Sequence, residues 1–571
     1  MKPQTSFLQN FFKLLKFLDK KDKTNILICV FMMVITSLLE VISIGSLIPF
    51  VAIFLSPENL LEIIKVDFIR INESNIGKLQ LIFALIFVTS VFFANMFKTY
   101  VLFLSIKLSK IISINLSQKI FAKLIDFNYK DLKNINSANV ISLVTDKMDS
   151  VGSVIFNFLN TCSSIIISFS VLTFLFIVDF QITIICLIVA LLVYFFIALL
   201  VKKRLENASK ILSFSSIKRV QHVKETFGTF KQITLFNSKS LFQNFFFQHD
   251  KNYKMAQFKT QFLGTFPRFV IEGVGIVLIV ILIYLFHNFL NYQAVFIITL
   301  VGALAFAAQR LLPQLNIIYQ FYSNLLSNSE FIKDVLDYLN LIQKKEKIKT
   351  KTFNEKLNFE KEIITKNVGF KYLDNSEFIF KNLNFKIKKG YNFAITGSTG
   401  SGKSTLIDLI MGFLNPSEGS IYLDRNEINY SNLQKYQNLI SHVPQEIFLF
   451  DNTIAQNISF EFDKKKIDQK KVINSAKLSE IHEFVDNLPN KYETVVGDNG
   501  ILLSGGQRQR IGLARALYQE KEILTLDEAT NALDIETEKK ILKNLKEKNI
   551  TIIQITHRTE NLDYYDDVLK L

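Results

Sequence analysis

Residues 392–405 read NFAITGSTGSGKST, and this stretch decides the fold of the C-terminal part of the chain. Asn392–Thr396 is typical of a short apolar strand, and a helical pattern begins near Leu406. The segment between them fits G-x-x-x-x-G-K-[ST] in the strand–loop–helix context that this pattern requires. Its glycines let backbone N–H groups turn inward and bind phosphate oxygens, assisted by the helix N-terminus. We therefore expect a nucleotide-binding α/β domain.

The phosphate loop predicts a set of ligand contacts. We expect Lys403 to reach the β- and γ-phosphates of ATP and the Ser404 hydroxyl to bind Mg²⁺. The residues predicted to hold the phosphates are Gly397, Ser398, Thr399, Gly400, Ser401, Gly402, Lys403, Ser404 and Thr405.

A second apolar strand, at residues 523–526, ends in two acids, Asp527 and Glu528. An acid at the carboxyl end of a strand fits the nucleotide crevice of an α/β sheet. We expect Asp527 to hold Mg²⁺ and Glu528 to polarise the attacking water as general base. Two adjacent acids after a strand are also typical of a solvated turn, but the phosphate loop favours the catalytic interpretation.

Between these motifs lies Leu503-Ser504-Gly505-Gly506-Gln507. With this signature segment the chain resembles the ATP-binding cassette (ABC) transporters, and the other markers of that family follow in order. They are Tyr372 ahead of the phosphate loop, Gln445 in Val443-Pro444-Gln445, Asn531-Ala532-Leu533-Asp534, and His557 in Thr556-His557-Arg558.

The resemblance implies a role for each marker. Tyr372 would stack on adenine, Gln445 would serve catalysis and contact both nucleotide and metal, and His557 would act with Glu528 in catalysis. The signature residues Ser504, Gly505, Gly506 and Gln507 would cover the γ-phosphate bound by a second copy. Because one chain carries one phosphate loop and one signature segment, two identical copies are needed to close two sites. We expect a homodimer that hydrolyses ATP.

The composition indicates a chain in two parts. It has 571 residues, 49% hydrophobic residues, 55 Phe and a formal net charge of +15, and its mean hydropathy is +0.26. Much of the positive charge flanks apolar blocks, so it indicates membrane topology and not nucleic-acid binding. The three cysteines, Cys29, Cys162 and Cys186, lie in apolar stretches, where we expect small buried side chains without a metal or disulfide pattern. The first apolar block is too long for a cleavable signal and is expected to anchor the chain.

Long apolar blocks before residue 350 predict membrane-spanning helices, each needing about 20 residues. The six predicted spans are 26–50, 79–105, 152–177, 180–201, 268–288 and 292–313, with an external loop at 56–78. Lys and Arg gather before span 1, between spans 2 and 3, and after span 4. By the positive-inside rule we expect these segments and both termini to be cytoplasmic. The membrane that the family resemblance implies is the bacterial inner membrane.

The two long cytoplasmic loops are expected to be helical extensions of the spans. Their helical patterns break at Phe127-Asn128-Tyr129 and between Thr226 and Asn237, around Gly228. Each break is either a surface turn or a tip that docks on an ATPase domain.

We therefore predict an α-helical membrane domain of the ABC exporter type, followed by an α/β ATPase domain with a phosphate loop. The expected boundaries are 1–340 for the membrane domain, 341–357 for a Lys-rich linker, and 358–571 for the nucleotide-binding domain.

Two further segments resemble flippases that move lipid-linked oligosaccharides for bacterial glycosylation. They are Phe266-Pro267-Arg268-Phe269-Val270-Ile271-Glu272-Gly273-Val274-Gly275 and Ala308-Gln309-Arg310-Leu311-Leu312-Pro313. The resemblance implies that the transported substrate is a lipid-linked oligosaccharide or a related glycolipid, with membrane lipid as a partner.

Three cations in the spans are candidate substrate residues, because ionisable groups at membrane depth are often functional. Lys98, Arg268 and Arg310 lie toward the cytoplasmic ends of spans 2, 5 and 6, where an inner-leaflet lipid places its phosphates. An Arg guanidinium offers a planar fork for phosphate. The alternatives are snorkelling side chains, and for Arg268 an ion pair with Glu272 one helical turn away.

Competing functions stay open at the sequence level. An exporter of drugs, simple lipids or peptides would share the same motifs, as would an ATP-gated channel or regulator. Glu528 and His557 speak against a regulator, which need not turn over ATP, and the spans exclude a soluble ATPase.

Overall fold

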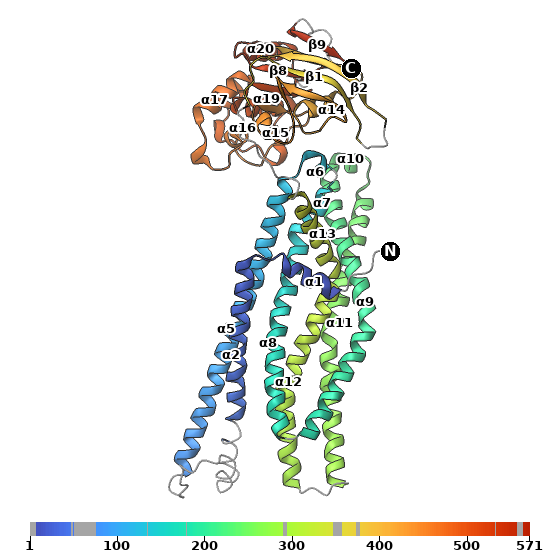
Figure 1. Ribbon diagram of the computed structural model, residues 1–571, viewed down its shortest axis with the longest axis vertical. Helices are drawn as coiled ribbons and strands as arrows, with labels where there is room; N and C mark the ends of the chain where they lie inside the picture. Colours follow the sequence, from blue (N-terminus) through green and yellow to red (C-terminus); the bar gives the residue numbers. More distant parts are fainter. Residues whose placement is uncertain are drawn as a thin grey trace. The chain divides into compact units, whose positions relative to one another are not determined.

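The computed structural model describes residues 7–46, 50, 76–133, 135–178, 180–288, 294–346, 357–372, 377–530, 533–556 and 564–571. The chain forms two compact units (Figure 1). The first comprises residues 1–127 and 133–348, and the second comprises 128–132 and 349–571. The division near residue 348 falls inside the predicted linker.

The first unit is built from helices that run side by side (Figure 1). The helix α5 has 50 residues and would be about 75 Å long at 1.5 Å per residue, more than twice the hydrocarbon thickness of a bilayer. The helices α9 and α11 are of similar length, so the spans do continue past the membrane as predicted. The main helices are α1 (Phe7–Lys16), α2 (Lys20–Gly45), α5 (Ile76–Ile125), α8 (Met148–Val178), α9 (Phe180–Gly228), α11 (Lys239–Asn288), α12 (Ala294–Ser327) and α13 (Ser329–Glu346).

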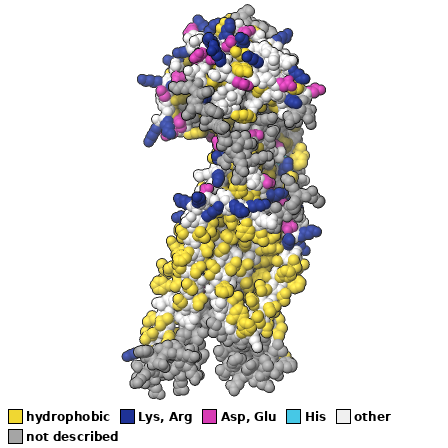
Figure 2. All heavy atoms as spheres, viewed as in Figure 1, with side chains coloured by type: hydrophobic (Ala, Val, Ile, Leu, Met, Phe, Trp, Pro, Cys, Tyr) yellow, Lys and Arg dark blue, Asp and Glu magenta, His cyan; other side chains and the backbone are white. Residues whose placement is uncertain are grey.

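Five helical segments among the described residues are long and apolar enough to cross a membrane. They are Lys20–Ser43, Gly77–Ile125, Ser137–Thr173, Thr183–Gly228 and Lys239–Ile281, and they match the first five predicted spans. The sixth predicted span falls on α12, and most of the external loop predicted at 56–78 lies outside the described residues. Hydrophobic side chains cover the surface of the spans, and a belt of Lys and Arg borders that surface (Figure 2). Lys and Arg at the ends of apolar spans are typical of the border between lipid and water.

Both predicted helix breaks are present. The helix α5 ends at Ile125 and a short helix α6 (Tyr129–Lys133) follows. Residues 128–132 belong to the second unit, where the Tyr129 ring lies 5.2 Å from the Phe413 ring, measured between centroids. The second break falls at Gly228, where α9 ends before α10 (Phe230–Leu235). Docking of either tip on an ATPase domain stays a prediction.

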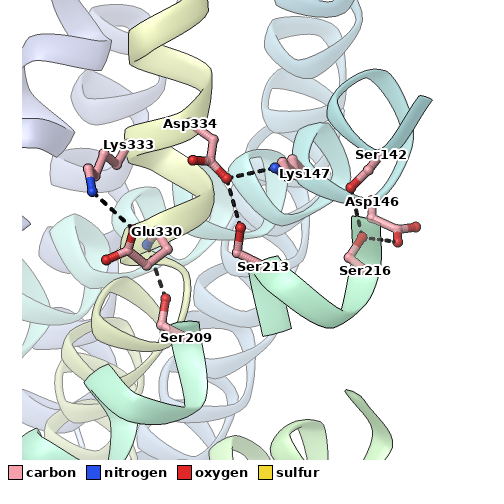
Figure 3. A network of polar contacts seen from close by, with 9 residues as sticks. All are labelled: Ser142, Asp146, Lys147, Ser209, Ser213, Ser216, Glu330, Lys333 and Asp334. Carbon is pink, nitrogen blue, oxygen red and sulfur yellow. Dashed lines mark hydrogen bonds and ion pairs between the residues drawn. The ribbon is translucent and has the colours of Figure 1, made fainter. Parts of the chain in front are cut away.

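A buried polar network joins three helical segments of the first unit (Figure 3). A π-helical turn (Leu143–Lys147) follows α7 (Ser137–Ser142) and precedes α8. Lys147, whose side chain is 3% exposed, donates from Nζ to Asp334 Oδ2 of α13 at 2.6 Å. The same oxygen accepts from Ser213 of α9 at 2.7 Å. Since a buried ammonium needs an anionic partner, this contact fixes α13 against the π turn.

The second unit contains two sheets. One is antiparallel, with the order β2-β1-β4-β5, and the other is parallel, with the order β6-β7-β8-β3-β9. The strands β3, β7 and β8 are buried along nearly their whole length, as expected for a covered parallel sheet. The strands are β1 (Glu362–Phe370), β2 (Phe380–Lys388), β3 (Asn392–Thr396), β4 (Glu418–Leu423), β5 (Asn426–Glu427), β6 (Ile440–Val443), β7 (Ile523–Asp527), β8 (Thr551–Ile555) and β9 (Asp567–Lys570).

The helices of the second unit fall into separate apolar clusters. The helix α14 packs with the sheets around Phe393, Leu406 and Ile421. The cluster around Ile458, Ala476 and Ile511 joins α16, α17 and α19. The phosphate loop and the signature segment are thus attached to different parts of the second unit, which we call the ATPase unit after its predicted function; the first unit is called the membrane unit. The helices are α14 (Lys403–Ile410), α15 (Leu433–Gln437), α16 (Ile454–Ser459), α17 (Gln469–Leu478), α18 (His482–Asp486), α19 (Gly505–Tyr518) and α20 (Ile535–Lys546).

Candidate functional site

The parallel sheet places the predicted nucleotide residues along one edge. Since β6, β7, β8 and β3 are parallel neighbours, their carboxyl ends share that edge. Gln445 follows β6, Glu528 follows β7, Thr556 follows β8, and Gly397 follows β3. This edge is where ligands bind in open α/β sheets.

The phosphate loop adopts a conformation that needs glycine. Gly397, Gly400 and Gly402 have φ of 149°, 87° and 96°. A Cβ at Gly402 would lie 2.5 Å from Ile379 Cγ2, so a side chain has no room there. Gly402 is the N-cap of α14 and has no side-chain cap. The N-terminal N–H groups of this helix are therefore available to an anion.

Lys403 is buried, and its ammonium lies against the loop itself. Its Nζ donates to the carbonyls of Gly397 at 3.0 Å and Ser398 at 2.9 Å. The Ser401 hydroxyl of the same loop is buried and has no hydrogen-bond partner among the described residues. An unsatisfied buried hydroxyl inside a loop of inward-facing groups fits a phosphate ligand.

Ser404 and Asp527 meet as predicted for a metal site. The Ser404 Oγ lies 3.4 Å from Asp527 Oδ1. Burial raises the pKa of the Asp527 carboxyl, and the hydrogen bond from Ser404 opposes that rise. A divalent cation would stabilise the carboxylate against this desolvation. A hydroxyl and a carboxylate at this position fit Mg²⁺, which prefers oxygen ligands and the phosphates of its nucleotide.

Glu528 and Gln445 are hydrogen-bonded to one another. Gln445 Nε2 donates to Glu528 Oε2 at 3.0 Å, which joins the ends of β6 and β7. Glu528 has φ of 52°, the left-handed region that side chains larger than Gly or Asn rarely occupy. Strained backbone of this kind clusters at functional sites. The turn points the Glu528 carboxylate toward the Gln445 amide. Two polar groups held together in this way suit the orientation of a water molecule.

Tyr372 contacts the helix that follows the phosphate loop. Its hydroxyl lies 3.1 Å from Thr405 Oγ1, and its side chain is exposed. A ring held beside α14 and open to solvent is placed to meet the base of a nucleotide whose phosphates occupy the loop.

The signature segment forms the start of α19. Ser504 is the N-cap, and a capping box joins it to Gln507: Ser504 N donates to Gln507 Oε1 at 2.8 Å and Gln507 N donates to Ser504 Oγ at 3.3 Å. Ser504 and Gly505 are exposed. The positive end of a 14-residue helix therefore faces outward, which suits an anion from another molecule.

Several residues of the site were not singled out from the sequence. Shortly after the end of β7, the Thr530 hydroxyl donates to Glu538 Oε1 at 2.7 Å and accepts from Gln554 Nε2 at 2.9 Å. All three side chains are buried, and the network ties the turn after Glu528 to α20 and β8. Sequence spacing offers no signal for such a contact, because its members come from three separate elements. His557, Asn531 and Ala532 lie outside the described residues, so their roles stay predictions.

Two of the three predicted substrate cations meet inside the membrane unit. Lys98 Nζ of α5 and Arg310 Nη1 of α12 both donate to Glu40 Oε1 of α2, at 3.3 Å and 3.2 Å. They therefore share one depth, as the sequence suggested. Arg268 instead donates from Nε to Glu272 Oε1 at 2.7 Å on its own helix, the ion pair that was the alternative for this residue. Glu40 was missed, although an acid inside an apolar span is itself a signal.

Comparison with known proteins decides the family. The family described as ABC transporter transmembrane region matches residues 24–329, more than half of the chain. A second family, described as ABC transporter, matches residues 380–531. The chain belongs to the ABC transporters. The predicted fold class, a helical membrane domain of the exporter type followed by an α/β nucleotide-binding domain, is confirmed, and the ATPase assignment of that domain is supported.

This ABC transporter also resembles individual proteins. It is 39% identical over 210 residues to an ATP-dependent lipid A-core flippase of Idiomarina loihiensis, covering 36% of each chain. It is 38% identical over 205 residues to the uncharacterized ABC transporter ATP-binding protein YfiB of Bacillus subtilis, covering 36% of this chain and 35% of that one. The alignments thus span about a third of the length of these curated relatives.

A solved structure of a bacterial Atm1-family ABC exporter with ATP bound shares the fold along nearly the whole chain. The TM-score is 0.77 at 21% sequence identity, covering 97% of this chain and 93% of that one.

Proposed function

We propose that two copies of this ABC transporter form an ATP-driven flippase that moves an anionic lipid across the bacterial inner membrane. The substrate class that we favour is a lipid-linked oligosaccharide or a related glycolipid. Both termini and the ATPase domain would face the cytoplasm, where ATP is available.

The chemistry that we assign to the ATPase unit is hydrolysis of the β–γ bond of ATP. The phosphate loop would bind the phosphates, and Lys403 would leave its loop carbonyls for the β- and γ-phosphates. Ser404 and Asp527 would hold the metal. When bound, Mg²⁺ neutralises charge on the phosphate oxygens. Glu528, positioned by Gln445, accepts a proton from the attacking water. In this reaction catalysis consists of positioning and electrostatic stabilisation.

Closing the site requires a second copy. The signature segment packs in the α16–α17–α19 cluster, separate from the cluster that carries the phosphate loop, and its capped N-terminus is exposed. We infer that Ser504 and the glycines after it cover the γ-phosphate on the partner subunit. A two-fold symmetric dimer then contains two such composite sites.

One observation carries the substrate proposal: Lys98 and Arg310 converge from two different spans at one point within the membrane unit. Cations at this depth are costly to place in lipid and mark a substrate path. A phosphate or pyrophosphate is the headgroup that such a pair of cations recognises. The relatives named as lipid A-core flippases support a lipid cargo and do not specify an oligosaccharide. We assign the phosphate contact to Lys98 and Arg310, whereas the Glu272 pair of Arg268 favours a structural role for that residue.

A vesicle assay tests this function. The purified protein is reconstituted in liposomes that contain either a fluorescent lipid-linked glycan or a simple phospholipid with the same fluorophore. We expect ATP-dependent movement of the lipid-linked glycan, measured by protection from an impermeant quencher. Movement of the phospholipid alone, or of a drug in place of either lipid, would establish the rival exporter functions. Hydrolysis without transport of any of them would favour a regulator.

A further inference from the structure

Glu40 is a buried carboxylate held by two cations from different helices. It lies on α2, and its side chain is 5% exposed. Its Oε1 accepts from Lys98 Nζ at 3.3 Å and from Arg310 Nη1 at 3.2 Å. The helix α2 packs along α5 and α8, whereas α12 packs along α8 and α11. The carboxylate therefore links the α2–α5 pair to α12 through charged side chains.

The carboxylate of Glu40 is unevenly hydrogen-bonded. Among the described residues, two cations converge on it. Both cations use the same oxygen, and Glu40 Oε2 is buried without a hydrogen-bond partner among the described residues. Burying a carboxylate oxygen without a hydrogen-bond partner is energetically unfavourable. A purely structural ion pair would be expected to satisfy both oxygens.

The two cations are more exposed than Glu40, and this difference indicates the side from which a substrate anion can approach them. The Lys98 side chain is 43% exposed and that of Arg310 is 27% exposed. Glu40 contacts the cations from the buried side, so a second anion can reach the same cations from the exposed side. Two carboxylate or phosphate groups cannot both take full contacts from the same pair of cations, because each cation has a limited set of donors and like charges repel.

We propose that Glu40 is a built-in counter-anion that competes with the phosphate of the substrate for Lys98 and Arg310. This inference rests on the proposed function, because it presumes that these cations bind a lipid phosphate. In the empty transporter Glu40 holds both cations and keeps them oriented. The substrate phosphate takes them over on binding, and the return of Glu40 to its two cations weakens the bound phosphate and promotes its release.

The test compares binding of a defined probe to the full-length dimer in nanodiscs. The probe is geranylgeranyl diphosphate, an anionic lipid without a glycan, and the matched neutral probe is geranylgeraniol. Glu40→Gln keeps the shape of the side chain and removes its charge. Because it removes a competing charge-assisted contact, we expect the diphosphate to bind about tenfold more tightly, with geranylgeraniol unaffected.

Inorganic pyrophosphate is a second probe, which has the headgroup without the lipid. If Glu40→Gln also binds pyrophosphate more tightly, the phosphate group suffices for the effect. If only geranylgeranyl diphosphate binds more tightly, the isoprenoid chain of the lipid is also needed.

Two further variants guard against an indirect effect. Glu40→Asp retains the charge but withdraws it by one methylene, so its affinity should lie between those of the wild type and Glu40→Gln. This variant also serves if Glu40→Gln fails to insert. Asp334→Asn is the matched control, since it neutralises a carboxylate that pairs with a buried cation elsewhere in the same unit. It should lower stability without tightening diphosphate binding.

The outcomes distinguish this inference from the proposed function. Unchanged or weaker diphosphate binding by Glu40→Gln and Glu40→Asp, in dimers that are folded and bind ATP, would overturn the counter-anion role while leaving the phosphate site in place. Failure of the wild type to bind any diphosphate would instead contradict the phosphate site itself. Equal tightening in Asp334→Asn would also overturn the proposal, because it would show that loosening the helices is enough.

Discussion

At the scale of single residues, Glu528 combines an unusual backbone conformation with the proposed role of general base. It follows the last residue of β7 and takes φ of 52°, so the chain turns sharply just after Asp527, the proposed metal ligand. Buried hydrogen bonds from Thr530 to Glu538 and from Gln554 to Thr530 hold the residues after this turn in place. Strain of this kind costs on the order of 1–3 kcal/mol and persists where neighbouring contacts fix it.

Replacing Glu528 with Gln should separate ATP binding from hydrolysis. The amide keeps the shape of the side chain and cannot accept the proton, so hydrolysis should fall by about 10²–10⁴-fold. ATP affinity should change little, and closed dimers should accumulate with Mg-ATP. Steady-state phosphate release and equilibrium ATP binding measure the two effects. A near-wild-type hydrolysis rate would remove Glu528 from the role of base.

The position of Tyr372 allows a direct optical test. The chain contains no Trp, so Tyr372→Trp introduces a single indole at the proposed adenine contact. Stacking on adenine should quench and shift its emission as ATP is added, with the midpoint equal to the dissociation constant. Tyr430→Trp, at another exposed tyrosine of the same unit, provides the control and should not respond. An unresponsive indole in a Tyr372→Trp protein that binds ATP would place the base elsewhere.

At the scale of elements, an ion pair joins the π-helical turn to α13, and its two side chains differ in exposure. The Lys147 side chain is 3% exposed, and that of Asp334 is 29% exposed. Asp334→Asn leaves a buried ammonium without its anion and should destabilise the membrane unit by several kcal/mol. Lys147→Met leaves a carboxylate that still accepts from Ser213 and reaches water, so its cost should be smaller. Thermal unfolding of the two variants checks the order, and equal costs would contradict the burial argument.

The strand β6 carries a group that makes the ATPase unit sensitive to acid. His442 Nδ1 lies 2.9 Å from Thr525 Oγ1, and burial lowers the pKa of His442 to about 4. The unfolded chain takes up a proton near pH 6.5, whereas the folded chain stays neutral until about pH 4. Stability therefore falls as the pH falls, by about 2 kcal/mol between pH 7 and pH 5.

Urea-dependent proteolysis of the ATPase unit at several pH values measures this loss. His442→Gln cannot titrate, so the variant should lose less stability over the same range. An identical pH dependence in the variant and the wild type would assign the acid sensitivity to other groups.

At the scale of the whole molecule, the sequence predicts well those features that depend on the order of residues along the chain. The phosphate loop, Glu528 and Gln445 each follow a strand, and the parallel sheet brings these strand ends to one edge. The spans and helix breaks follow from apolar length and local pattern.

Contacts between distant segments were not predictable in the same way. The Glu40 pair with Arg310 joins residues 270 positions apart, and the Thr530 network joins three elements. Hydropathy and spacing carry no information about which faces of separate helices meet. The sequence therefore identified Lys98 and Arg310 as candidates, and only the packing of α2, α5 and α12 revealed the carboxylate that they share.

The central claim of this account is that each ATP site is built from two copies of the chain. Complementation between two inactive chains tests it most directly. Lys403→Ala disables the phosphate loop, and Ser504→Arg obstructs the lid over the phosphate of the partner. Each variant should be inactive as a homodimer.

In the mixed dimer, isolated with two different affinity tags, the intact loop of one chain meets the intact signature segment of the other. One functional site results, so the ATPase rate should recover to about half of the wild-type value if the two sites act independently. Recovered hydrolysis in this mixed dimer is the result that the account predicts. An inactive mixed dimer, together with ATP turnover by wild-type protein that stays monomeric in lipid, would show that each chain closes its own site and would contradict the account.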